Sequence, residues 1–165
     1  MNNNLKFTLL LFSIFSFSNE VEAQINSNYT INVTSSSSAN YTLSGTDFNG
    51  TVSGNDPNLT FFVGDDITFS VNASGHPFYL KTVAGTGTGN LISGVTNNGM
   101  TANNVIWTPT TAGTYYYQCS LHSGMVGTIT INAVNDAPVA TAQTDVVATE
   151  QTEVTLTLAG TDADS

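Results

Sequence analysis

The sequence predicts an all-β fold, a Greek-key β-sandwich, with a truncated second β domain at the C-terminus. Apolar and polar residues alternate over short segments, as in 29–34 and in the run Ile67, Phe69, Val71, and a period of two is typical of strands with one buried face. No segment after residue 23 repeats its apolar positions at the helical period of about 3.6. Turn-forming residues separate about seven or eight such segments, a spacing that favours a sandwich.

The chain of 165 residues is expected to divide into three parts. Residues 1–23 have the pattern of a secretory signal peptide, with a lysine, a Leu- and Phe-rich run at 5–17 and the small residue Ala23 before the expected cleavage site. The run is shorter than the roughly 20 residues of a membrane-spanning helix. We therefore expect export to the periplasm, the cell surface or the medium, without membrane insertion of the mature chain. Residues 24–133 form the predicted sandwich, and residues 134–165 follow it.

The elements of the sandwich are predicted from alternation between turn signals. The expected strands are 29–34, 67–71, 78–80, 105–107, 115–119 and 126–132, with short paired segments at 41–43 and 50–52 and a further run at 59–63 that ends in a tight turn. The stretch 84–104 is rich in Gly, Thr and Asn and is predicted to be a long surface connection. Its alternating glycines could cradle a phosphate only with a helix start and usually a Lys behind them, and the sequence has neither there.

The strand that ends at Cys119 has a predictable sidedness. Tyr115, Tyr117 and Cys119 share one face, and Tyr116 and Gln118 share the other, because side chains alternate along a strand. If Cys119 points inward, Tyr115 and Tyr117 should belong to the core.

The charge balance excludes one class of partner. The chain has 2 basic and 12 acidic residues; without residues 1–23, which hold one Lys and two Glu, Lys81 faces ten acids. Affinity for nucleic acid comes mainly from Lys and Arg that neutralise phosphates, so no nucleic-acid partner is expected. The acidic surface favours solubility and could steer a basic partner, or it could be an adaptation to salt.

The candidate metal ligands are the only cysteine, both histidines and one methionine. Cys119, His122 and Met125 follow one another at steps of three, and His76 lies far upstream. A thiolate, two imidazoles and a thioether are the donors of a trigonal copper site with a weak axial Met. A strand that ends at Cys119 and a short turn can bring the three nearby donors to one point, and His76 must come from another part of the fold. The set predicts one Cu(I)/Cu(II) ion.

Other interpretations of the same residues stay open. Cys119 alone would be interpreted as an inert buried thiol. His76 alone would be interpreted as a strand-end histidine with a satisfied hydrogen bond. Zinc could take two His and a Cys, although structural zinc prefers four strong ligands. A Cys–His nucleophile pair lacks a third group that would orient it.

The motif Gly-x-Tyr-x-x-x-Cys-x-x-His-x-x-Met, which begins at Gly113 and follows a distant Gly-His, resembles the cupredoxin family of blue copper proteins, and its short loop resembles the amicyanin-like members. The likeness covers residues 27–133. It implies that the equatorial copper ligands are His76, Cys119 and His122, that the axial ligand is Met125, and that Tyr115 is the tyrosine packed at the corner before the penultimate strand.

Two departures from the family pattern concern the hydrogen bonds to the Cys sulfur. Members usually have Asn after the upstream His, with a backbone N–H that bonds the sulfur, whereas Pro77 has no N–H. Many small members have Pro before the second His, where this chain has Leu121, which does carry an N–H. One bond is lost and another gained, which bears on the redox potential more than on the choice of metal.

The C-terminal residues 134–165 differ in character from the sandwich. Asn-Asp-Ala-Pro at 135–138 and Thr-Asp-Ala-Asp at 161–164 resemble the start of the Ig- or cadherin-like repeats of large bacterial surface proteins. Asp162 and Asp164 are either calcium ligands or part of a solvated turn. About thirty residues cannot bury a core alone, so we expect a truncated repeat and further β-repeats beyond Ser165.

Two functions follow from these patterns. The first is a type I copper protein that transfers electrons outside the cytoplasm to a redox partner protein, with His122 as the electron port, as the resemblance implies. The protein is not expected to be an enzyme, because one metal without an open position offers no place for a substrate. The second is a module of a multidomain secreted or surface adhesin-like protein that binds copper or is purely structural. The residues beyond Ser165 would discriminate between them.

Overall fold

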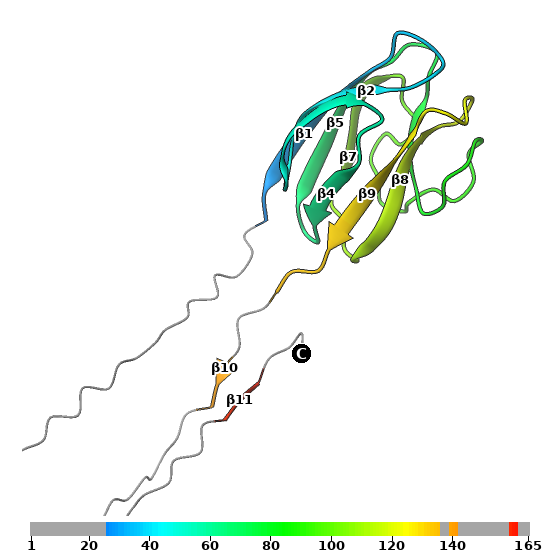
Figure 1. Cartoon of the computed structure of the whole chain (residues 1–165). Coiled ribbons are helices and arrows are strands. Elements are labelled where there is room, and N and C mark those ends of the chain that lie inside the picture. The colour runs from blue at the N-terminus through cyan, green and yellow to red at the C-terminus, as the bar shows by residue number, and fades with distance from the viewer. Residues whose placement is uncertain (1–25, 136–138, 142–158, 162–165) are drawn as a thin grey trace, which may run out of the picture. The chain divides into compact units, whose positions relative to one another are not determined.

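The computed structural model describes residues 26–135, 139–141 and 159–161 (Figure 1). Residues 26–135 belong to one compact unit, and residues 139–141 and 159–161 belong to another. The predicted signal peptide lies outside the described residues. Among the residues that are described, no helix is long and apolar enough to cross a membrane.

The larger unit consists of two β-sheets that face each other (Figure 1). The first has the order β3-β2-β1-β5-β7, with β1 (Asn28–Thr34), β2 (Thr42–Asp47), β3 (Gly50–Asn55), β5 (Asp66–Asn72) and β7 (Ala102–Trp107). The second has the order β4-β9-β8-β6, with β4 (Leu59–Phe62), β6 (Phe78–Lys81), β8 (Gly113–Cys119) and β9 (Val126–Asn132). The prediction of an all-β sandwich is confirmed.

Alternation places one face of each sheet in the core. In β5, Ile67 and Phe69 are fully buried and Val71 nearly so, while the residues between them are more exposed. Such a pattern forms a strand because only one face can be removed from water in a two-layer protein. Two parallel pairings, β1 with β5 and β4 with β9, join strands far apart in the sequence.

Aromatic side chains fill the core under the end of the sandwich that carries the histidines. Phe78 packs against Tyr41 at 5.2 Å and against Tyr117 at 5.4 Å between ring centroids. All three rings are fully buried, and such contacts contribute beyond the buried area. The Tyr117 ring leaves no room for a side chain at Gly127 on β9, because a Cβ there would lie 2.2 Å from the Tyr117 hydroxyl oxygen.

The predicted surface connection is observed, with one correction at its end. Residues 82–101, here called the Gly-rich loop, contain no strand and touch the sheets through isolated bridges such as Lys81 with Leu91. The prediction extended the connection to residue 104, but β7 begins at Ala102. Residues 102–104 pair with residues 70–72 of β5, and this long-range pairing, not their own polar sequence, makes them a strand.

The C-terminal unit shows only a short antiparallel pair. β10 (Val139–Ala140) pairs with β11 (Gly160–Thr161), and the Thr141 N–H donates to the Ala159 carbonyl at 2.8 Å. Residues 142–158 and the candidate calcium ligands Asp162 and Asp164 lie outside the described residues. The Ig- or cadherin-like repeat therefore stays a prediction.

Candidate metal centre

His76 is presented by a tight turn between β5 and β6. Its N–H donates to the Ala73 carbonyl at 2.9 Å, and Gly75 before it has a φ of 78°. Glycine suits this position because other residues rarely adopt a positive φ. The turn leads into Phe78, which pairs with Cys119 across the β6–β8 ladder, so that His76 and Cys119 lie at the same end of one sheet.

Cys119 and His122 are placed by residues 120–125, here called the metal loop. Cys119 is the last residue of β8 and is fully buried. Its N–H donates to the Met125 carbonyl at 3.0 Å, and the Met125 N–H donates to the His122 carbonyl at 3.3 Å. These bonds close the turn and return His122 toward the cysteine, because the loop is too short for any wider path.

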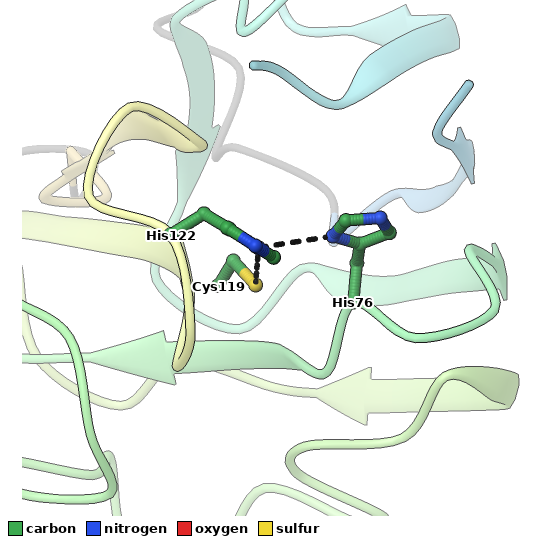
Figure 2. Close-up of side chains that lie close together, drawn as sticks. All are labelled: His76, Cys119 and His122. Carbon is green, nitrogen blue, oxygen red and sulfur yellow. Dashed lines mark hydrogen bonds between the residues drawn. The ribbon is translucent and has the colours of Figure 1, made fainter. Parts of the chain in front are cut away.

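The three strong donors converge (Figure 2). The Nδ1 atoms of His76 and His122 are 3.2 Å apart, and Cys119 Sγ is 3.6 Å from His122 Nδ1. All three donor atoms lie within 4.8 Å of one another, with both histidines half-buried. His76, Cys119 and His122 are thus positioned to form a metal site.

The spacing of these donors fits a trigonal metal. Bonds of about 2.0 Å to nitrogen and about 2.3 Å to sulfur, at about 120°, place neighbouring donors roughly 3.5–3.7 Å apart. The 3.2 and 3.6 Å separations are close to these values. Imidazole nitrogens and a cysteine sulfur can all act as metal donors once they carry no proton, so their convergence favours a shared cation. A soft sulfur beside two imidazoles suits copper.

The metal loop also buries the Met125 side chain and donates a hydrogen bond to the cysteine sulfur. The Met125 side chain is fully buried, and its role as the axial ligand stays a prediction. The Leu121 N–H donates to Cys119 Sγ at 3.5 Å. The hydrogen bond expected from Leu121 is therefore present at a position where proline would abolish it.

Three supporting residues were missed by sequence reasoning. Gln118 is 2% exposed, and its Nε2 donates to the carbonyls of His122 and Met125 at 3.0 and 3.1 Å. Lys81, 1% exposed, donates through Nζ to the carbonyls of Gly85 and Gly87 in the Gly-rich loop. The third is Tyr41, whose hydroxyl donates to the His76 carbonyl. Only Lys81 had a signal in the sequence, as the single basic residue of the expected mature chain, directly before the Gly-rich stretch.

The predicted sidedness of β8 holds in part. Tyr117 and Cys119 are fully buried as expected, but Tyr115 is only half-buried. The Tyr115 hydroxyl donates to the Thr111 carbonyl at 3.0 Å, the arrangement expected of a tyrosine corner. Gln118, expected on the face opposite Cys119, is also buried, because the metal loop folds over the end of the strand and its carbonyls accept the amide.

Burial also affects the titration of groups around the site. It raises the pKa of Tyr41, and nearby Cys119 and Asp56 raise it further. Burial raises the pKa of Tyr117 as well. Both hydroxyls therefore stay protonated and act as hydrogen-bond donors.

No protein-family model matches this chain, and a search of curated protein sequences found none that matches. Solved structures similar to it include the copper protein rusticyanin, with 17% identity and a TM-score of 0.46 over 66% of this chain and 80% of rusticyanin. Rusticyanin from Thiobacillus ferrooxidans matches with 19% identity and a TM-score of 0.44 over 66% and 79% of the two chains. A purple cupredoxin from Nitrosopumilus maritimus matches with 22% identity and a TM-score of 0.39 over 62% and 98%. At these low values, the assignment of the site rests on its own donor atoms.

Proposed function

We propose that this protein binds one copper ion in a type I site and transfers electrons outside the cytoplasm. The observation that carries the proposal is the convergence of two imidazole nitrogens and one cysteine sulfur at one end of the sandwich. In this proposal His76, Cys119 and His122 are the equatorial ligands and Met125 is the axial ligand. Copper would supply the one-electron couple Cu(II)/Cu(I).

The chain's contribution is a set of donors whose positions are fixed by backbone hydrogen bonds. Cys119 lies at the end of a ladder, and the metal loop is closed on both sides of His122. Donors held in this way move little when the charge at the site changes by one electron. Small movement favours fast transfer, because the environment does not need to reorganise.

The path for the electron is proposed to leave through His122. Its ring is half-buried, and Leu121 beside it is 63% exposed. An exposed apolar side chain next to a half-buried ligand offers a contact surface for a redox partner protein that excludes water without a charged patch. We expect the partner, whose identity is open, to dock at this edge.

The location is part of the proposal. Residues 1–23 have the pattern of a signal peptide, which supports export to the periplasm or the cell exterior. N-terminal sequencing of the protein recovered from expressing cells should begin at Gln24. Retention of Met1 would contradict export by cleavage.

The copper function is tested by voltammetry of the full chain beside Cys119→Ser. The wild type should take up one equivalent of Cu(II) and show a reversible one-electron wave. The serine variant keeps the size of the side chain but offers a hydroxyl in place of the thiolate, so it should lose the wave. A wild-type protein that binds no copper would overturn the proposal and leave the structural-module function as the alternative.

A further inference from the structure

Tyr41 connects two distant parts of the chain at the metal site. It lies one residue before β2 and is fully buried. Its hydroxyl donates to the carbonyls of His76 and Pro77, each at 3.0 Å. These two carbonyls belong to the turn that presents the upstream histidine, 35 residues further along the chain.

The position of Tyr41 is itself fixed from two sides. Its N–H donates to Asp56 Oδ1 at 3.0 Å, and its carbonyl accepts the Asp56 N–H at 2.9 Å. Its ring packs edge-on against Phe78 at 5.2 Å and lies 6.3 Å from Tyr117. Because the backbone of Tyr41 is hydrogen-bonded and its ring is packed, its hydroxyl has a fixed position and can hold the carbonyls that it bonds.

The His76–Pro77 segment depends on a side chain for hydrogen bonds, because its proline cannot donate one. Pro77 has no N–H, so it cannot tie this segment to the cysteine sulfur or to a neighbouring strand. The strand ladder resumes only at Phe78, which pairs with Cys119. Between the Ala73–His76 turn and that pair, the Tyr41 hydroxyl shares its one proton between the carbonyls of His76 and Pro77.

We infer that Tyr41 is a positioning residue of the metal site, whose hydroxyl holds the His76–Pro77 segment so that His76 Nδ1 keeps its distance from His122 and Cys119. The inference rests on the proposed copper site and names a further determinant of it. Tyr41 is not a ligand. It holds the backbone that carries one, and its side chain also lies close to Cys119.

The test compares Tyr41→Phe with Tyr117→Phe. Both tyrosines are fully buried, and both hydroxyls donate to a main-chain carbonyl, that of Tyr117 to Pro57 at 2.8 Å. Each variant keeps its ring and loses one hydroxyl, so both should lose stability. Only Tyr41→Phe should weaken the affinity for Cu(II), by about 10-fold or more, because supporting partners of ligands typically contribute this much.

The same pair of variants has a spectroscopic readout that stability alone would not change. Tyr41→Phe should alter the copper hyperfine splitting and shift the sulfur-to-copper absorption band, while Tyr117→Phe keeps the wild-type spectrum. Equal affinity and identical spectra in Tyr41→Phe and wild type would overturn the inference. If Tyr41→Phe does not fold, Asp56→Gly decides, because it removes the acceptor of the Tyr41 N–H, suits the φ of 45° at this position and replaces no ring. Weaker metal binding is then expected, and unchanged binding would overturn the inference.

Failure of the copper function would be seen separately. If the wild type takes up no Cu(II), or shows no sulfur-to-copper band, the proposed function fails. Cobalt(II), whose thiolate bands also report the geometry of a His–Cys site, then becomes the probe for Tyr41. A wild-type protein that binds neither metal overturns both proposals, whereas normal copper binding with an unaffected Tyr41→Phe overturns only the role of Tyr41.

Discussion

The metal loop and the Gly-rich loop meet at one hydrogen bond but are held by different means. The metal loop is short. Apart from the bond from the Gly87 N–H to the Ser120 carbonyl and the contact between the two histidine rings, its bonds join residues no more than seven positions apart, as from Gln118 to Met125. The Gly-rich loop is long and mostly exposed, and it is fastened by Lys81 and by Asn98, whose side chain bonds both the N–H and the carbonyl of Leu80. The metal loop is thus organised mainly by bonds between residues close in the sequence, whereas the Gly-rich loop is fastened to β6, through the buried Lys81 of that strand and through its own Asn98.

Gln118→Leu should have the largest effect on stability, because it removes the side chain that bonds two carbonyls of the metal loop. The carbonyls of His122 and Met125 would each lose one of two donors, because the backbone N–H groups that also bond them remain. At about 0.5–1.5 kcal/mol for each hydrogen bond, we expect a loss of about 2 kcal/mol in the free energy of unfolding. Copper binding should weaken as the loop loosens. Denaturant unfolding measures the first effect and metal titration the second.

Tyr116→Phe is the control for that change, because Tyr116 is the neighbouring, half-buried residue of β8. It should stay within about 0.5 kcal/mol of wild type. A Gln118→Leu protein as stable as this control would show that the amide does not hold the loop.

Lys81→Met should have the second largest effect and should act on the Gly-rich loop. The carbonyls of Gly85 and Gly87 lose their donor, but water can reach them in part, so we expect a loss of about 1–2 kcal/mol. The Gly87 N–H, which donates to the Ser120 carbonyl at 2.8 Å, should exchange with solvent faster. Val83→Ala, at a 54% exposed position of the same loop, is the control. Unchanged exchange at Gly87 in Lys81→Met would show that the two loops are not coupled through this lysine.

Met125→Leu separates packing from ligation within the metal loop. The two side chains have similar volume, so the cost in stability should stay under about 1.5 kcal/mol. If the Met125 sulfur is the axial ligand, copper stays bound and the reduction potential rises, because a donor to Cu(II) has been removed. Voltammetry checks this outcome. An unchanged potential would mean that Met125 only fills the core.

Asp56→Asn should have the smallest effect on stability. Asp56 belongs to neither the metal loop nor the Gly-rich loop. Burial raises the pKa of Asp56 above its ordinary 3.8, against a smaller lowering by the Tyr41 N–H. The folded protein therefore holds this proton more tightly than the unfolded chain, and the resulting stabilisation is lost as the pH rises through the folded pKa. Asparagine keeps the acceptor and does not ionise, and it tolerates the φ of 45° at this position.

The variant should therefore equal or exceed wild type in stability at pH 7, and the advantage should disappear below about pH 3.8. Unfolding free energies at both pH values test this. A variant that is less stable than wild type only at pH 7 would contradict the raised pKa.

The sequence predicts those parts of the site whose chemistry is local or unique. Cys119 and His122 were found from their spacing, and His76 because the chain has only one other histidine. Strands such as β5 were predicted because alternation is visible within one segment. The parallel pairings β1–β5 and β4–β9 were not predicted, because alternation does not specify a partner strand.

The supporting residues could not be predicted for a physical reason. Gln118 and Lys81 are residue types that are usually exposed, and each is buried here because carbonyls of a folded loop accept its hydrogen bonds. The link from Tyr41 to His76 spans 35 residues and exists only after both sheets have packed. Such contacts depend on tertiary structure and leave no periodic trace in the sequence.

The central claim is that His76, Cys119 and His122 bind copper through the cysteine sulfur. The most direct measurement is the visible absorption and EPR spectrum of the full chain after addition of one equivalent of Cu(II), beside Cys119→Ala. We predict an intense sulfur-to-copper charge-transfer band and a narrow copper hyperfine splitting, both absent from the variant. A colourless protein, or a spectrum that Cys119→Ala leaves unchanged, would contradict the claim.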